Sequence, residues 1–150
     1  MPQDVPFGTQ LLGQVEKTLN AILGRLLAGS GVTEPQWVTL NVVLATGEPL
    51  AIADAAQRTA AALKVDGETA RTHLNALVDA GFLVPPEEAA DDGTAVTASG
   101  RAFHASMRAQ IDELTARLWG DVPSHDLAVA ADVLNTVLDR AGIELARPAT

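Results

Sequence analysis

The feature that most constrains this fold is one segment, residues 64–84, which predicts a helix with a defined start, one apolar face and a defined end. Asp66 precedes the helix, and an aspartate there accepts hydrogen bonds from the free backbone N–H groups of the first turn. Gly81 ends it, where a left-handed residue is favoured, and residues 82–84 predict a short strand. The apolar residues between recur at helical spacing: Ala70, Leu74, Leu77 and Val78. Two interpretations remain open, an exposed helix that contacts another macromolecule and an ordinary core helix.

Helices dominate the first part of the chain. Residues 9–28 carry a broad apolar face at helical spacing. Thr33 and Gln36 form a capping box, in which each side chain satisfies a backbone donor of the other residue. The helix that follows holds Trp37 and is apolar nearly all round, which predicts a buried position at the centre of the fold.

A small hairpin is predicted in the middle of the chain. Residues 46–49 predict a turn and residues 50–63 an alanine-rich helix, which precedes the capped helix described above. Residues 85–93 are a polar loop, and 94–96 predict the strand that returns against 82–84. The expected fold class is therefore mainly α, with a small β-hairpin.

Two further helices are expected after the hairpin. Thr97 and Ser99 are cap candidates for a helix over residues 99–118, in which apolar residues recur three or four apart. Ser124 is the expected cap of a last helix, which Gly142 is expected to close.

The chain is expected to be one unit, residues 1–150, with a division of labour. Residues 33–96 form a helical subdomain with the hairpin, and the long helices within 9–28 and 99–145 form a second subdomain. The apolar faces of these long helices are wider than one small unit can cover. We expect them to pack against a second copy in a two-fold homodimer, the alternative being that they pack on their own domain.

Composition narrows the function. The formal net charge is −9, which opposes nonspecific binding to nucleic acid or to a membrane surface. No segment is long and apolar enough for a membrane span, and the N-terminus lacks the pattern of a signal peptide. The absence of cysteine fits a reducing interior, so a bacterial cytoplasm is the expected location.

No enzyme, cofactor or metal site is expected. The three histidines, His73, His104 and His125, lie far apart and lack a second ligand at helical spacing. The sequence contains no nucleophile motif and no phosphate-binding glycine loop.

Four motifs, in this order along the chain, resemble the MarR family of winged helix-turn-helix transcriptional regulators. They are Val-Thr-Glu-Pro-Gln-Trp-Val-Thr-Leu (32–40), Lys-Val-Asp-Gly-Glu-Thr-Ala (64–70), Leu-Val-Asp-Ala-Gly-Phe-Leu (77–83) and Val-Thr-Ala-Ser-Gly-Arg-Ala (96–102). The resemblance covers nearly the whole chain. It implies a winged helix-turn-helix with long dimerisation helices, and a homodimer that inserts two recognition helices into a pseudo-palindromic site on double-stranded DNA. It also implies release of DNA by a small anionic or aromatic effector bound between the subdomains.

The sequence departs from the family pattern in its charge. Where the family tends to have a basic residue on the recognition helix, this chain has Thr72, and the arginine is one place earlier, at Arg71. The expected wing, which contains Asp91 and Asp92, has no arginine. From Glu48 to Ala95 there are three basic residues and nine acidic ones, a formal charge of −6. Weak or selective DNA binding is therefore expected, because phosphates repel like charge.

Two sets of candidate site residues follow. Hydrogen-bond donors and cations on or beside the recognition helix are the DNA-binding candidates, with solvated surface side chains as the alternative: Arg58, Lys64, Thr69, Arg71, Thr72, His73 and Asn75. The effector candidates lie where the Trp37 helix is expected to meet the helix of Phe103; Arg108 or His104 can hold a carboxylate there. The alternative is that Trp37 is a core residue.

Two function hypotheses remain open. The first is a homodimeric DNA-binding transcriptional regulator of MarR type. The second is a winged helix that has lost DNA binding and acts as a protein-interaction or ligand-sensing module. The acidic residues of the expected wing and the formal charge of −6 between Glu48 and Ala95 favour this second hypothesis.

Overall fold

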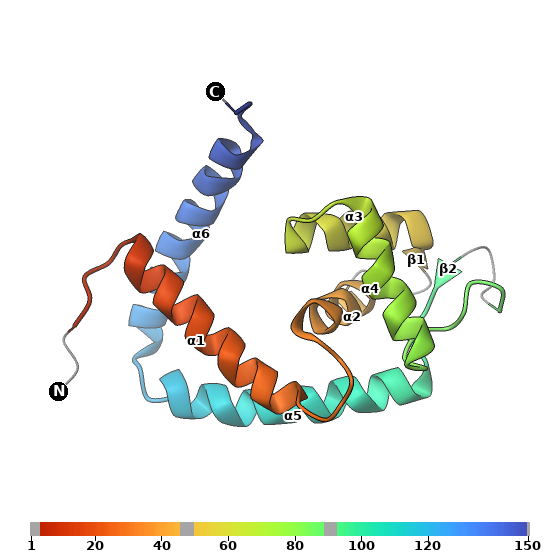
Figure 1. Ribbon diagram of the computed structural model, residues 1–150. Coiled ribbons are helices and arrows are strands. Elements are labelled where there is room, and N and C mark those ends of the chain that lie inside the picture. The colour runs from red at the N-terminus through yellow and green to blue at the C-terminus, as the bar shows by residue number, and fades with distance from the viewer. Residues whose placement is uncertain (1–3, 46–49, 89–92, 150) are drawn as a thin grey trace. The chain divides into compact units, whose positions relative to one another are not determined.

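The computed structural model describes residues 4–45, 50–88 and 93–149, and these are mainly helical (Figure 1). The elements follow in the order α1 (Thr9–Leu27), α2 (Glu34–Ala45), β1 (Leu50–Ala51), α3 (Ile52–Leu63), α4 (Gly67–Asp79), β2 (Gly93–Thr94), α5 (Ala98–Trp119) and α6 (Ser124–Ala146). The chain forms two compact units, Met1–Gln110 and Ile111–Thr150. The predicted fold class, a mainly α winged helix, is confirmed.

Helix α2 is the centre of the first unit, as its apolar sequence predicted. Leu40 and Val43 are fully buried, and α1, α3 and α4 all contact α2. The predicted capping box is present: Gln36 N donates to Thr33 Oγ1 at 3.4 Å, and Thr33 N donates to Gln36 Oε1 at 3.1 Å. A local polar pair thus sets where the central helix begins.

The sheet differs from the prediction in its strands and in their pairing. Residues 50 and 51 were expected to begin a helix, but they form β1, which pairs antiparallel with β2 in the register Leu50↔Thr94 and Ala51↔Gly93. The predicted hairpin strands 82–84 and 94–96 pair only at an isolated antiparallel bridge, Leu83 to Val96, so the two segments meet as expected but do not form the expected strands. Two residues are too short for a periodic pattern, so only the pairing reveals this strand. The predicted turn at 46–49 lies outside the described residues.

Helix α4 has the predicted boundaries. Asp66 accepts a hydrogen bond from Thr69 N at 2.7 Å and caps the helix. Ala70, Leu74 and Leu77 are buried on one face. Gly81 has φ +82°, and Phe82 N donates to Leu77 O at 2.9 Å, which closes the C-terminus. The segment after the helix therefore leaves in a defined direction.

The start of α5 is joined to the end of α4. The Thr97 hydroxyl donates to Gly81 O at 2.6 Å and accepts from Gly100 N at 3.0 Å, while Thr97 N donates to Phe82 O at 3.0 Å. Gly100 passes so close to this joint that a Cβ would lie 2.4 Å from Phe82 O. Thr97 is the predicted cap, but the need for glycine at Gly100 was not predicted.

Helix α6 differs from the prediction at both ends. Ser124 is its first residue, Pro123 is at the N-cap position and no side chain caps the helix. Gly142 does not close it, because the helix continues to Ala146. A glycine inside a helix costs only about 1 kcal/mol relative to alanine, which the surrounding turns of a long helix can absorb. Within the described ranges, no helix is both long and apolar enough to cross a membrane.

We expect Gly100→Ala to destabilise the first unit by about 2 kcal/mol, because the added Cβ must displace the Phe82 carbonyl or the Val96 side chain. Urea denaturation followed by circular dichroism measures the change. Gly24→Ala is the matched control, since nothing lies within 4 Å of a Cβ there; it should raise stability by up to about 1 kcal/mol. Equal effects of the two substitutions would contradict the close approach at Gly100.

Candidate nucleic-acid interface

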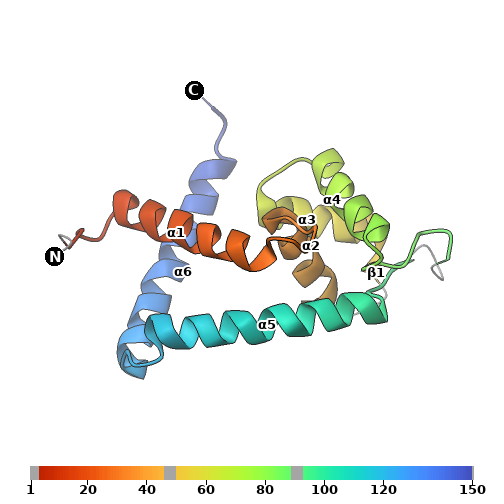
Figure 2. The same ribbon diagram turned by 60° about the horizontal axis from the view of Figure 1, so that its bottom comes forward.

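The outer face of α4 is an exposed polar surface. Figure 2 shows α4 on the outside of the first unit, with α2 and α3 on its inner side. The residues opposite the buried stripe are all exposed: Glu68, Thr72, Asn75 and Asp79. We call these four residues the outer face of α4. One side of α4 therefore packs and the other meets solvent, as an exposed helix requires, and its contact with another macromolecule stays a prediction.

The predicted DNA-binding residues fall into three groups. Arg71, Thr72 and Asn75 are exposed on α4, whereas Thr69 and His73 are partly buried at its margins. Lys64 is exposed just before α4 and has φ 59°, a left-handed conformation that the sequence did not predict. Arg58 is exposed on α3. Because α3 and α4 contact each other, all seven residues belong to one helix pair.

Two of the polar groups on α4 are already used within the helix. Thr69 N donates to the Asp66 carboxylate, and Thr72 Oγ1 donates to Glu68 O at 3.1 Å. The hydrogen bonds from the Thr69 backbone N–H and, to a smaller extent, from its hydroxyl hold the pKa of Asp66 below its usual value. The donors left for a ligand on the exposed part of α4 are therefore chiefly Arg71 and Asn75.

Carboxylates outnumber cations around this helix pair. Asp54, Glu68, Asp79, Glu87 and Glu88 are exposed, against Arg58, Lys64 and Arg71. Asp91 and Asp92, which the sequence analysis assigned to an acidic wing, lie outside the described residues. Because none of these groups is buried, the excess of acidic residues predicted from the sequence lies on the surface of the folded chain. This excess opposes binding to DNA phosphates.

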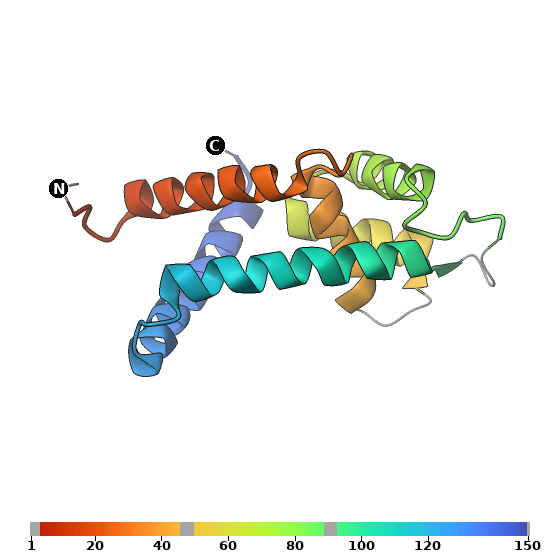
Figure 3. The ribbon, with the colours of Figure 1, turned by 90° about the horizontal axis from the view of Figure 1, so that it is seen from below.

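The effector candidates meet in an aromatic cluster within the first unit. Trp37, only 5% exposed, stacks on His104 with ring centroids 5.1 Å apart and meets the edge of Phe103 at 6.1 Å. Phe103 stacks on Phe82 at 4.8 Å. Figure 3 shows the first half of α5 running past α2. The stacking of Trp37 on His104 joins these two helices. The predicted meeting of the Trp37 and Phe103 helices is present, and Trp37 contributes to the core.

Asn41 is a member of this cluster that the sequence analysis missed. Its Nδ2 donates to Trp37 O at 2.9 Å, so its Oδ1 faces His104 Nε2, 2.8 Å away. This arrangement requires His104 Nε2 to carry a proton and to donate it to Asn41. A polar residue four positions after Trp37 in an otherwise apolar helix was the available signal.

Arg108 lies one turn beyond His104 on α5 and is exposed. Burial and, secondarily, the positive charge of Arg108 lower the pKa of His104 below its usual value. His104 and Arg108 are thus placed on one side of α5, at the edge of the aromatic cluster.

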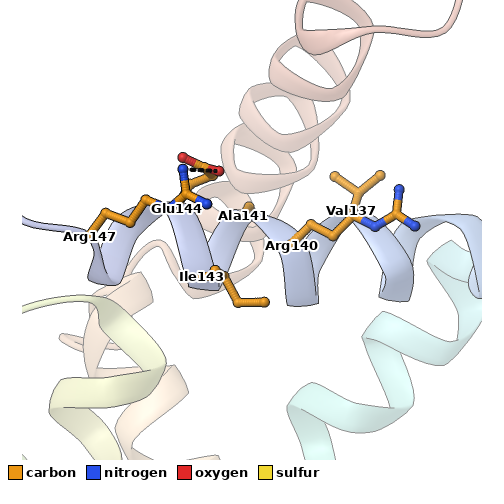
Figure 4. Close-up of a pocket in the computed structure, with 6 residues that line it drawn as sticks. All are labelled: Val137, Arg140, Ala141, Ile143, Glu144 and Arg147. Atoms are coloured by element: carbon orange, nitrogen blue, oxygen red, sulfur yellow. Dashed lines mark ion pairs between the residues drawn. The ribbon is translucent and has the colours of Figure 1, made fainter.

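Two open cavities lie elsewhere. One of about 380 Å³ lies at the α1–α2 connection, lined by residues that include Gly29, Gly31 and Glu34. The other, a groove of about 460 Å³, runs along α6 and is lined by Val137, Arg140, Ala141, Ile143, Glu144 and Arg147 (Figure 4). Among the residues the structure describes, no three potential ligand side chains gather to hold a metal ion.

Several solved structures share this fold. The Mycobacterium tuberculosis MarR family protein Rv2887 in complex with DNA is 25% identical, and the match covers 89% of this chain and 98% of that one with a TM-score of 0.66. The Staphylococcus aureus MepR–DNA complex is 18% identical, with 90% and 96% covered and a TM-score of 0.73. CouR from Rhodococcus jostii RHA1 bound to p-coumaroyl-CoA is 18% identical, with 85% and 88% covered and a TM-score of 0.70.

The chain has the MarR fold. The resemblance predicted from the four ordered motifs is thereby confirmed. No family model matches the sequence, and no curated protein is significantly similar to it by sequence. Two further structures of this fold, from Rhodococcus sp. RHA1 and Silicibacter pomeroyi, are described as MarR family transcriptional regulators and are 19% and 22% identical.

We expect His104 to make stability pH-dependent. Because its pKa is lower in the folded chain than the ordinary 6.5, the unfolded chain binds more protons as pH falls. The contribution is fully present above pH 6.5 and is lost as pH falls through the folded-state pKa. Urea midpoints of the parent and of His104→Gln, which keeps a donor for Asn41 but cannot titrate, should diverge below pH 6.5. Parallel pH profiles for the two proteins would contradict this assignment.

Proposed function

We propose that this protein is a DNA-binding transcriptional regulator, a homodimer that binds a pseudo-palindromic duplex site. The observation that carries the proposal is the outer face of α4, which is exposed and polar on a helix capped by Asp66. Rv2887 and MepR adopt the same fold in complex with DNA. A helix presented in this way fits the major groove. A regulator of this kind acts in the cytoplasm, where we place the protein.

The small number of exposed cations on α3 and α4 limits how strongly the protein can bind DNA phosphates. Arg58, Lys64 and Arg71 are the exposed basic residues of the α3–α4 pair, so each subunit offers at most three side-chain cations there for phosphates. Affinity should therefore be weak against random DNA and should depend on contacts with base edges. Thr69, Thr72, His73 and Asn75 are the remaining candidate contacts on α4, and Asn75 is the exposed donor among them.

The homodimer is supported by the apolar surface of α6. Apolar side chains along this helix are exposed in the single chain: Leu127, Val129, Val133, Leu134, Val137, Leu138, Ile143 and Leu145. Arg140 borders the same groove, and Arg147 there pairs with Glu144 at 3.3 Å (Figure 4). An apolar surface of this length is stable in water only when it is covered, and a second copy covers it symmetrically.

An effector is the further part of this proposal. Trp37, His104 and Arg108 are the candidate contacts, because an arginine can hold a carboxylate by two hydrogen bonds at the edge of the aromatic cluster. CouR, which has the same fold, was solved with p-coumaroyl-CoA bound, and this supports a small aromatic or anionic ligand here.

The DNA-binding prediction is tested by selection from a random duplex pool at about 50 mM salt, followed by mobility shift on the enriched sequence. Arg71→Ala should weaken binding about tenfold, since it removes one of three cations in each subunit. Arg25→Ala on α1 makes the same charge change away from α4 and should leave binding nearly unchanged. Failure to enrich any duplex at low salt would contradict the proposal.

The exposed carboxylates favour one second candidate, a protein-interaction module. Glu87 and Glu88 extend the acidic surface beyond α4 on the loop after Val84. On this hypothesis no duplex is retained at low salt, and a protein bound through the same face is lost when Glu87 and Glu88 are changed to lysine. The selection experiment therefore separates the two candidates.

We expect the purified protein to sediment as a dimer and Leu138→Glu to shift it toward the monomer, because Leu138 is 62% exposed in the single chain. Analytical ultracentrifugation at micromolar concentration measures this. Asn135→Glu adds the same charge on the side of α6 that carries Asp132 and Asp139 and serves as the control. A monomeric parent protein would rule out the dimer.

A further inference from the structure

The first turn of α4 presents one free carboxylate to a ligand. Asp66 is committed to its cap, where it accepts from Thr69 N at 2.7 Å. Glu68 is exposed, and within the described part of the chain no cation pairs with it. A carboxylate is tolerated at this position because the N-terminus of a helix carries partial positive charge.

The position of Glu68 matters because the N-terminal residues of a recognition helix lie nearest the base edges. A carboxylate only accepts hydrogen bonds. In the major groove, guanine presents acceptors at N7 and O6, and thymine presents the O4 acceptor and a methyl group. Cytosine presents the N4 amino donor with no acceptor of its own at that edge. Adenine presents the N6 amino donor beside the N7 acceptor, so cytosine is the base that offers Glu68 a donor with no acceptor next to it. Glu68 therefore has one wholly favourable base partner.

The neighbouring residues on the outer face of α4 extend this surface. The Thr72 hydroxyl donates to Glu68 O at 3.1 Å, so its methyl group is the part left to contact a base. Asn75 is exposed further along the same face, and its amide matches the N6 and N7 edge of adenine. Glu68 and Asn75 are about 10 Å apart along the helix axis, a span of roughly three base-pair steps.

We propose that Glu68 is a specificity-determining residue that accepts a hydrogen bond from cytosine N4 in each half-site and rejects guanine and thymine there. This inference rests on the proposed function. It explains what an acidic residue does on a DNA-binding helix: it lowers affinity for sequences that place acceptors opposite it and spares those that offer a donor.

Asp79 provides a matched control on the same helix. It is exposed on the outer face of α4 and carries the same charge, but it lies eleven residues after Glu68, about 16 Å along the helix. Asp79→Asn and Glu68→Gln therefore remove equal charge from the outer face at its two ends. Only the second substitution changes the group nearest the bases.

The experiment is selection from a random duplex pool with the full chain, its Glu68→Gln variant and its Asp79→Asn variant, followed by sequencing of the enriched pools. The parent should enrich cytosine at one position of each half-site, and Glu68→Gln should reduce the preference there roughly tenfold while the rest of the motif persists. Asp79→Asn should strengthen binding to all sequences and leave the motif unchanged.

The contrary outcomes are distinguishable. An enriched motif that is identical in the parent and in Glu68→Gln overturns the role of Glu68 but leaves the proposed function standing. Enrichment by Glu68→Gln alone also overturns it, because Glu68 would then only repel DNA. If none of the three proteins enriches a duplex, the proposed function fails and this inference fails with it.

Discussion

The contact between the end of α4 and the start of α5 holds the outer face of α4 in place. The Thr97 hydroxyl makes two hydrogen bonds: it donates to Gly81 O and accepts from Gly100 N. Gly100 lets the two backbones approach, and the stacked rings of Phe82 and Phe103 continue the contact beside it. The long helix α5 thereby fixes the C-terminal end of α4. A helix that must fit a groove needs this rigidity, because a small rotation would misplace every side chain on it.

The charge of the α3–α4 surface limits the kind of DNA recognition that the proposed function can use. Most nonspecific affinity for duplex DNA comes from cations that neutralise phosphates, and the α3–α4 pair has few of them. Hydrogen bonds to base edges must then supply a larger share of the discrimination. Placing the exposed carboxylate of Glu68 at the start of α4 is consistent with such a surface, since repulsion from wrong sequences is itself a source of specificity.

The aromatic cluster is a second set of contacts that joins the start of α5 to α2 and to the end of α4. Trp37 on α2 stacks on His104, and Asn41 holds His104 by a hydrogen bond whose direction is set by the Trp37 carbonyl. Because Phe103 lies between Trp37 and Phe82, a change at His104 has a packed path to the end of α4. The proposed effector, bound at the edge of this cluster, would contact residues whose packing continues to the end of α4.

The sequence by itself determined the features that depend on neighbouring residues. The Asp66 cap, the Thr33–Gln36 capping box and the left-handed Gly81 were all predictable, since their partners lie within about one turn. The exposed set on α4 followed from its period. Only the tertiary structure decided the β1–β2 pairing, the Asn41–His104 bond and the demand for glycine at Gly100. These join residues more than forty positions apart or depend on a backbone that arrives from elsewhere in the fold, and no local pattern encodes them.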